Sequence, residues 1–292
     1  MLYVLDWSGF LFRAYYSMPH ILDKNWNDAW AIFWFYRMIL KLLQSKPDNF
    51  IIVFDPWKKT KRMEEFKEYK ANRPKIEDSF KLQIPKIIDI AKQSWINVEI
   101  IPEYEADDVI WSIVNSYEKD SYVVSSDKDL KQLISDKVKF IEPKTMEITD
   151  KNKFKEEYWF DPKWIILYLA LLWDSSDNIP WVKWIGKKTA QDIVSKFQTY
   201  DELMANLSNL KPKIQEKILE NKDLLIKNIE LVTLLSPWDY KSEEIEKKSD
   251  ISNIDLKKLE NILVEIYWLT SFSKLIYKLE KDLIQPTQQA LF

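Results

Sequence analysis

Short apolar runs alternate with longer amphipathic stretches along the first half of the chain. Four runs have the length and composition of buried strands: Leu2–Leu5, Phe50–Phe54, Val98–Ile101 and Tyr122–Val124. Around them, apolar residues recur every three or four positions, which predicts four helices: Phe10–Ser17, Trp30–Gln44, Phe80–Gln93 and Ala106–Tyr117. This alternation predicts an α/β fold with a mostly parallel central sheet and helices on both faces.

Acidic residues follow the predicted strands. Asp6 ends the first run, Asp55 ends the second, and Asp127 lies shortly after Tyr122–Val124. Open parallel sheets bind ligands at the carboxyl ends of their strands, so these three carboxylates are expected on one edge of the sheet. Four more acidic residues are expected near this edge: Glu105, Asp107, Asp108 and Asp129.

The second half of the chain is predicted to be helical. A helix over Pro162–Leu172 leads into Asp174 and Asp177, which are three apart and can share a cation. The following stretch, Ile179–Lys188, is typical of a hairpin that lays backbone N–H groups along a phosphodiester. Helical patterns then continue through Leu231.

The acidic set predicts a metal site. An isolated acidic pair is more often a solvated helix start, but five acidic segments that converge on one edge would repel strongly without cations. The chain has no cysteine and a single histidine, His20, which we expect to be structural or merely exposed. All-oxygen ligands favour Mg²⁺ or Mn²⁺ over zinc, with two or more ions in the site.

Charge and composition bound the remaining possibilities. The net charge of −3 is a poor guide, because eight bases and three acids between Lys58 and Lys75 give that stretch a local charge of +5. This stretch is either a solvated helix or a surface that faces the phosphate of a nucleic acid. With 46% hydrophobic residues, no long apolar run and no signal peptide at the start, we expect a globular, cytoplasmic, monomeric protein.

Several ordered words resemble one enzyme family over nearly the whole chain. They are LDWSGFLFRAYY, FKEYKANRP, EYEADDVIW, SSDKDLKQLIS and DSSDNIPWVKWIGKKTA. Together they resemble the 5′-3′ exonuclease domain of bacterial DNA polymerase I and the related flap endonucleases. We expect no polymerase activity, whether the chain is a stand-alone form or a fragment of a longer gene. The resemblance implies a PIN-like nuclease domain over 1–160 with a basic helical arch at about 58–75. A helix-three-turn-helix, duplex-binding region over 161–284 and a flexible tail over 285–292 would follow.

The resemblance also implies roles for individual residues. The family's metal ligands match Asp6, Asp55, Glu105, Asp107, Asp108, Asp127, Asp129, Asp174 and Asp177. Lys70 and Arg73 match catalytic residues that approach the scissile phosphate, and Tyr69 either stacks on a base or belongs to the core. The implied DNA contacts are Arg13, Arg62, Lys183, Gly186, Lys187, Lys188 and Thr189.

The predicted function is therefore metal-dependent hydrolysis of flaps, nicks and RNA-primed 5′ ends in replication and repair. Two ions about 4 Å apart would activate water and stabilise the leaving oxygen. Two alternatives stay open: a catalytically inactive, structure-specific DNA-binding protein, and an RNase on the same fold. Trp7 beside Asp6 would favour the inactive protein if the tryptophans are real.

Tryptophan stands where this family has glycine. The chain has 2 glycines and 14 tryptophans, whereas ordinary usage would give about 20 glycines. Ten tryptophans fall on family glycine positions: Trp7, Trp34, Trp57, Trp95, Trp111, Trp159, Trp173, Trp181, Trp184 and Trp268. Trp26, Trp30, Trp164 and Trp238 do not align firmly. Either the protein is rich in aromatic residues, or its source reads UGA as glycine and the sequence was translated with UGA as tryptophan.

The last residues suggest a partner. Gln288 to Phe292 read QQALF and resemble the peptide by which bacterial replication proteins dock into the sliding clamp. Gln288, Leu291 and Phe292 would make that contact. Alternatively, Leu291 and Phe292 fold back onto the protein's own core.

Overall fold

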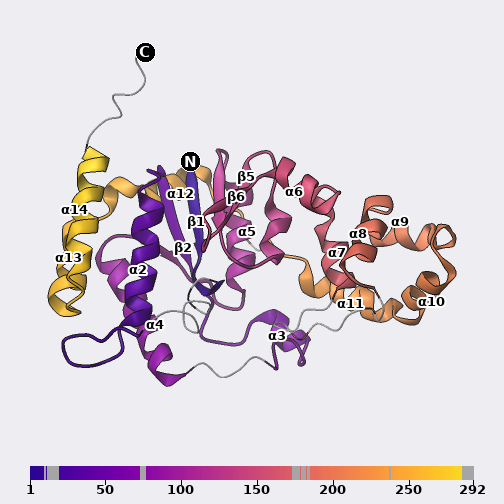
Figure 1. Cartoon of the computed structure of the whole chain (residues 1–292), viewed down its shortest axis with the longest axis horizontal. Helices are drawn as coiled ribbons and strands as arrows, with labels where there is room; N and C mark the ends of the chain where they lie inside the picture. The colour runs from indigo at the N-terminus through magenta and orange to yellow at the C-terminus, as the bar shows by residue number, and fades with distance from the viewer. Residues whose placement is uncertain are drawn as a thin grey trace, which may run out of the picture.

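A six-stranded sheet forms the centre of the computed structural model, which describes residues 1–9, 11, 20–72, 77–172, 178, 182, 185–236 and 238–284. The strands are β1 (Leu2–Asp6), β2 (Asn49–Val53), β3 (Asn97–Glu99), β4 (Ser121–Val124), β5 (Val138–Glu142) and β6 (Glu147–Thr149). Their order is β3-β2-β1-β4-β5-β6, and only the β5–β6 pair is antiparallel among the described strands (Figure 1). The predicted mostly parallel sheet is confirmed.

The sequence pattern did not predict β5 and β6. β5 carries Lys139 among its apolar residues, and β6 is only three residues long with two exposed positions. Such a short hairpin gives little periodic signal, because alternation needs four or more residues to be recognised. The predicted strands over Phe50–Phe54 and Val98–Ile101 each lie within two residues of the observed β2 and β3.

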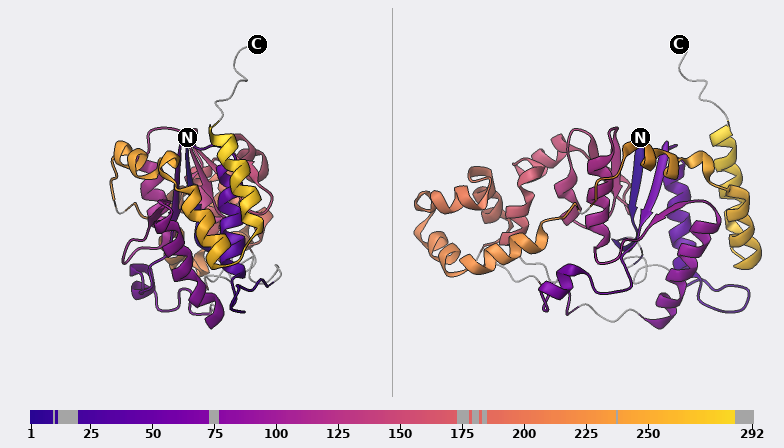
Figure 2. Two further views of the ribbon diagram at one scale, coloured as in Figure 1. Left: turned by 90° about the vertical axis from the view of Figure 1, so that its left-hand side faces the viewer. Right: turned by 180° about the vertical axis from the view of Figure 1, so that it is seen from behind.

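Both faces of the sheet are buried. In β1, Leu2 and Val4 belong to one apolar cluster, while Tyr3 and Leu5 belong to the other. Helix α5 (Ala106–Ser116) packs on the first face, and α2 (Trp30–Leu43) and α4 (Asp78–Gln93) cover the second, as Figure 2 shows from two further sides. Continuous apolar strands with helices on both sides are the arrangement expected of a parallel sheet.

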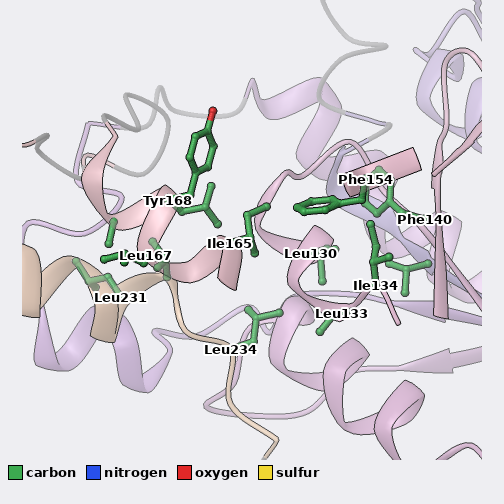
Figure 3. Packing of buried hydrophobic residues seen from close by; sticks show 14 of the residues in the cluster. Leu130, Leu133, Ile134, Phe140, Phe154, Ile165, Leu167, Tyr168, Leu231 and Leu234 are labelled. Carbon is green, nitrogen blue, oxygen red and sulfur yellow. The ribbon is translucent and has the colours of Figure 1, made fainter. Parts of the chain in front are cut away.

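The first apolar cluster continues from the sheet into a helical bundle. The bundle consists of α7 (Ile165–Leu171), α8 (Lys187–Lys196), α9 (Tyr200–Ala205), α10 (Pro212–Glu220) and α11 (Lys222–Val232). Figure 3 shows Leu130, Phe140 and Phe154 of the α/β part in one packed row with Ile165 of α7 and Leu231 of α11. The bundle therefore shares a core with the sheet. α6 (Lys151–Tyr158) lies between the two parts.

The last helices do not belong to the bundle, which corrects the prediction of one helical region over 161–284. After α11 the chain returns to the sheet, where α12 (Ser242–Ser249) contacts β2. Helices α13 (Leu256–Asn261) and α14 (Ser271–Ile284) pack against α4 and α2 at the end of the molecule opposite the bundle (Figure 1). Helical periodicity predicts an apolar stripe but does not say which surface the stripe will cover.

Among the helices of the described ranges, none is both long and apolar enough to span a lipid bilayer.

Candidate active site

The carboxyl ends of three adjacent strands and the start of α5 bring four aspartates together. Asp6 ends β1, Asp55 follows β2, Asp127 follows β4, and Asp107 lies in the first turn of α5. Because β2, β1 and β4 are neighbours and parallel, their ends meet at one edge of the sheet. We call these four residues the acidic edge.

The four charges act on one another. Burial raises the pKa of Asp107 well above its usual range, and the carboxylates of Asp127, Asp6 and Asp55 raise it further, while the Lys70 ammonium opposes them. The pKa of Asp6 is also raised, first by burial and then by Asp55, although hydrogen bonds from two serines lower it. The acidic edge therefore holds more negative charge than its protein surroundings compensate.

Hydroxyl groups hold Asp6 in place. Ser125 Oγ donates to Asp6 Oδ2 at 2.6 Å, and the N–H and Oγ of Ser8 donate to Oδ1 at 2.9 Å each. A Cβ on Gly9 would lie 2.7 Å from Ser126 Oγ and 3.2 Å from Asp6 Oδ2, so the site has no room for a side chain there. Sequence reasoning missed these small residues, although each lies within three positions of Asp6 or Asp127.

Asp55 is held by two donors. The N–H of Ala106 donates to Oδ1 at 2.9 Å, and the indole Nε1 of Trp7 donates to Oδ2 at 3.1 Å. The Trp7 ring is buried and stacks on Phe54 with 5.1 Å between ring centroids. Each carboxylate oxygen of Asp55 thus accepts a hydrogen bond from the protein.

The acidic edge suits a hard divalent cation by its chemistry. It offers only carboxylate oxygens, and a cation would offset the repulsion that raises the pKa of Asp107. In the part of the chain that the structure describes, however, no three acidic side chains are arranged to hold one ion. Asp6 accepts from Ser8 and Ser125 and Asp55 accepts from Trp7 and Ala106, and each carboxylate has lone pairs beyond those that these bonds use.

Glu105 and Asp108 are two of the predicted metal ligands, but in the structure they bind a buried arginine. Arg62 donates to Glu105 Oε2 at 2.7 Å and to Asp108 Oδ1 at 2.9 Å. Glu105 also accepts from Tyr69 Oη at 3.0 Å and from Lys70 Nζ at 2.8 Å. Burial raises the pKa of Glu105, but Lys70 and Arg62 outweigh it and bring the pKa below its usual range. In this structure both carboxylates anchor the basic stretch.

Two predicted DNA contacts are corrected by the same arrangement. The Arg62 side chain is only 7% exposed and its guanidinium is engaged by carboxylates, so it does not offer a surface contact to phosphate. Tyr69 is buried with its hydroxyl on Glu105, which leaves no face for a base to stack on, and the core alternative holds. Charge density along a sequence cannot distinguish a cation that faces solvent from one that faces a buried acid.

Lys70 lies between the basic stretch and the acidic edge. Its ammonium is 2.8 Å from Glu105 Oε1 and close enough to lower the pKa of Asp107. Within its described residues, 58–72, the basic stretch forms one short helix, α3 (Lys61–Glu65), followed by turns up to Asn72. Asn178, the residue before the predicted hairpin, donates to Glu68 O and accepts from Asn72, so the chain contacts this stretch just before the hairpin begins.

The predicted duplex contacts that the structure describes lie at the start of α8. Gly186 caps the helix with extended backbone, φ −94°, and a Cβ there would meet no atom within 4 Å. Lys187 and Lys188 are exposed and Thr189 is partly exposed in the first turn. Asp129 is buried, and its N–H donates to Asp127 Oδ1 at 2.8 Å. The remaining predicted residues lie outside the described residues: Arg13, Arg73, Asp174, Asp177, Lys183, Gln288, Leu291 and Phe292.

Family models match the chain in two adjoining parts. Residues 1–159 match the 5′-3′ exonuclease N-terminal resolvase-like domain, and residues 160–257 match the 5′-3′ exonuclease C-terminal SAM fold. A 5′-3′ exonuclease of Aquifex aeolicus is 32% identical over 295 residues, covering 100% of this chain and 99% of the relative. DNA polymerase I of Caldicellulosiruptor bescii is 32% identical over 286 residues, which cover 94% of this chain but 33% of that protein.

Solved structures show the same fold at lower identity. A bacteriophage T5 flap endonuclease in complex with DNA and metal ions has a TM-score of 0.67 at 19% identity, covering 97% of this chain and 99% of that one. The catalytic core of Rad2 with DNA substrate has a TM-score of 0.54 at 16% identity, covering 95% and 92%. The predicted PIN-like fold with a helical C-terminal part is confirmed.

Proposed function

Because the chain belongs to the 5′-3′ exonuclease family, we propose that it hydrolyses DNA phosphodiester bonds at flaps, nicks and RNA-primed 5′ ends during replication and repair. The observation that supports this proposal most directly is the acidic edge, where burial and the carboxylates of Asp127, Asp6 and Asp55 raise the pKa of Asp107 at the ends of neighbouring strands. We also propose that the protein works in the cytoplasm, where replicating bacterial DNA lies.

The residues of the acidic edge would hold two or more Mg²⁺ or Mn²⁺ ions, together with Asp129, Asp174 and Asp177. Such ions supply a nucleophilic water at neutral pH and offset charge on the leaving oxygen. The acidic edge would orient the scissile bond in line with that water. Lys70, whose ammonium donates to Glu105 in this structure, would move to a phosphate oxygen and offset developing negative charge there.

The start of α8 would grip the duplex without reading its bases. Its free backbone N–H groups carry the positive end of the helix dipole, and the exposed Lys187 and Lys188 add two full charges. The T5 flap endonuclease and Rad2 structures are complexes with DNA. We therefore propose branched or nicked duplex DNA as the substrate and a monomer as the active form.

A labelled 5′-flap duplex tests the function. With Mg²⁺, the wild-type protein should release a short 5′ product, and an Asp127→Ala control should release none. Binding of the flap without cleavage by the wild type would favour an inactive DNA-binding protein. Cleavage confined to an all-RNA strand would favour the RNase. Both the sequence as written and a variant with glycine at the ten family positions should be assayed, because the Trp7 indole donates a hydrogen bond to Asp55, a residue of the acidic edge.

Metal binding should stabilise the folded protein. Crowded carboxylates destabilise the fold when no cation is present, and a ligand that binds only the folded state adds RT ln(1 + [L]/Kd), about 2.7 kcal/mol at one hundred times Kd. We expect the melting temperature to rise between EDTA and excess Mg²⁺ at pH 7.5. Equal melting temperatures in the two buffers would contradict a functional metal site.

The tail motif QQALF, which lies outside the described residues, is proposed to dock into the sliding clamp. Leu291 and Phe292 would fill an apolar pocket on the clamp, and Gln288 would bind at its rim, which raises the local concentration of the nuclease near new 5′ ends. Isothermal titration of the clamp should show binding by the full chain and none by a Leu291→Ala, Phe292→Ala double variant. Equal affinities would rule out the tether.

A further inference from the structure

One buried guanidinium joins three separate segments of the chain. Arg62 of α3 donates to Glu105 Oε2 at 2.7 Å and to Asp108 Oδ1 at 2.9 Å, both at the start of α5. Its second terminal nitrogen also donates to the carbonyl oxygen of Thr233 at 3.0 Å, just after α11. Asp108 Oδ1 in turn accepts from the N–H of Leu235 at 2.9 Å. A planar fork with fixed donor directions makes such a junction geometrically specific.

The turn held by Arg62 carries part of the acidic edge. Glu105 and Asp108 flank Asp107, and they also close a capping box at the first turn of α5. The N–H of Ala106, in the same turn, donates to Asp55 Oδ1 at 2.9 Å. Any displacement of this turn would therefore move Asp107 directly and release Asp55 from one of its two donors.

The third segment leads to the proposed duplex grip. Thr233 and Leu235 follow α11, the helix that packs on α7, and α7 packs on α8. The start of α8 carries the exposed lysines that would bind the duplex. The same guanidinium thus fixes the end of the bundle against the turn that bears Asp107.

We propose that Arg62 is a positioning residue that sets where along the DNA the cut falls, by holding the helical bundle and the acidic edge at a fixed separation. This inference rests on the proposed nuclease function. Arg62 touches neither substrate nor metal in this account; it acts through Asp107 and through the segment after α11.

Three variants and one control test the position of the cut. Arg62→Lys keeps the charge but loses the fork. Arg62→Met with Asp108→Leu replaces the Arg62–Asp108 pair by apolar side chains, which often restores stability, and Glu105 keeps its ion pair with Lys70. The third variant, Arg62→Met alone, measures the loss of stability when Asp108 stays buried without its cation. Lys119→Met, which breaks a surface ion pair to Glu246, is the control. Product lengths on a 5′-flap duplex are read at single-nucleotide resolution, with kcat, KM and melting temperature.

Wild type and Lys119→Met should cut at one position. All three Arg62 variants should spread products over neighbouring nucleotides and lose about 10- to 100-fold in kcat, with KM within about threefold because α8 is unchanged. The double variant should recover its melting temperature without recovering the cut position. If the double variant gave the same product lengths as the wild type, Arg62 would contribute to stability alone and would not set the position of the cut. Absence of cleavage by the wild type would instead overturn the nuclease function.

A separate observation concerns the tryptophans. Among the described residues, nine that are not glycine have left-handed backbone, and four of these are tryptophans: Trp26 (φ 64°), Trp95 (φ 58°), Trp159 (φ 68°) and Trp268 (φ 61°). Glycine adopts this conformation without strain, whereas a bulky side chain does not. Neither of the chain's two glycines has a positive φ.

The positions themselves are typical of glycine. Trp95 lies just after α4. Trp159 is the C-terminal cap of α6 in the left-handed conformation, and the Trp159 N–H donates to Lys155 O at 2.9 Å. The four indoles are 64–84% exposed, so packing does not offset the backbone strain. Trp30 is the opposite case, because it is 1% exposed at the first position of α2 and packs on Phe80.

We infer that positions 26, 95, 159 and 268 are glycine in the protein that the cell makes, with UGA codons read as glycine, and that position 30 is a true tryptophan. Position 26 is new in this set, because the family words do not align there. The gene should carry UGA at the four positions and UGG at position 30, and peptide masses of the native protein should show glycine at the four. UGG codons, or tryptophan masses, at the four would overturn the inference.

Stability gives a test that does not need the source organism. A variant with Trp26→Gly, Trp95→Gly, Trp159→Gly and Trp268→Gly should melt about 5 °C or more above the sequence as written. Trp30→Gly should melt lower, because it removes a buried ring from α2. A fourfold variant that melts no higher than the written sequence would contradict the inference.

Discussion

Asp107→Asn should lower flap cleavage by at least about a thousandfold, which corresponds to about 4 kcal/mol of transition-state stabilisation. The same change should raise the melting temperature of the metal-free protein. Burial and the carboxylates of Asp127, Asp6 and Asp55 raise the pKa of Asp107, so its charged form is disfavoured in the folded state. Asparagine removes that charge, and relief of such functional strain commonly stabilises by about 0.5–2 kcal/mol.

The pH dependence of this stabilisation follows from the direction of the shift. A carboxylate whose folded pKa is raised binds more protons in the folded state, so its contribution to stability falls as pH rises from about 3.9, the unfolded value, to the folded pKa. The difference in melting temperature between Asp107→Asn and wild type should be small near pH 4 and reach a plateau above the folded pKa. Thermal melts in EDTA from pH 4 to 8 measure it.

Asn at position 136 provides the matched control, since Asp136 is exposed and pairs with Lys151 at the surface. Asp136→Asn should leave the cleavage rate unchanged and should change the free energy of unfolding by no more than about 0.5 kcal/mol. A variant of Asp107 that cleaves at the wild-type rate would exclude it from the active site. If Asp107→Asn melted at a lower temperature than the wild type in EDTA, the carboxylates of the acidic edge would not be destabilising one another.

Phe272→Ala should destabilise the α/β part of the protein by about 3–5 kcal/mol. Phe272 lies in α14 and is fully buried, with Phe33 of α2 at 5.3 Å between ring centroids. Loss of the ring would leave a cavity between helices that are more than two hundred residues apart in the chain. Chemical denaturation followed by hydrogen exchange of β1 and β2 would show the loss in the sheet itself.

Tyr277→Ala is the control on the same helix, because Tyr277 is 58% exposed. Its effect should stay within about 0.5 kcal/mol. If Phe272→Ala left the exchange of the sheet unchanged, α14 would be an independent appendage, and the prediction of a separate helical region would be restored.

Strand ends and helix periods predicted the centre of the molecule well. The runs that end at Asp6 and Asp55 are β1 and β2, and α2, α4 and α5 lie within two residues of their expected bounds. These elements are long or uniformly apolar, so their periods are unambiguous. The return of α13 and α14 to α2 could not be predicted, because amphipathic helices of this kind fit any apolar surface of the right width.

Placement of the charged residues was predictable only in part. Asp6, Asp55 and Asp127 follow strands, and the sheet topology alone brings them to one edge. Arg62 lies three residues from Glu65 and eight from Lys70 in a uniformly charged stretch, and nothing in that spacing separates the buried cation from the exposed ones. Its partners Glu105 and Asp108 are more than forty residues away, so the pairing depends on tertiary structure.

The position of α14 has a consequence for anything joined to the protein. The chain starts at the end of the sheet opposite the acidic edge, and α14 finishes on that same side, as Figures 1 and 2 show. A fluorophore, affinity tag or additional domain attached at the N-terminus, or directly after Ile284, would therefore start on the side opposite the one where the DNA would be cut. Fusion or surface immobilisation at the N-terminus should leave access to the acidic edge open.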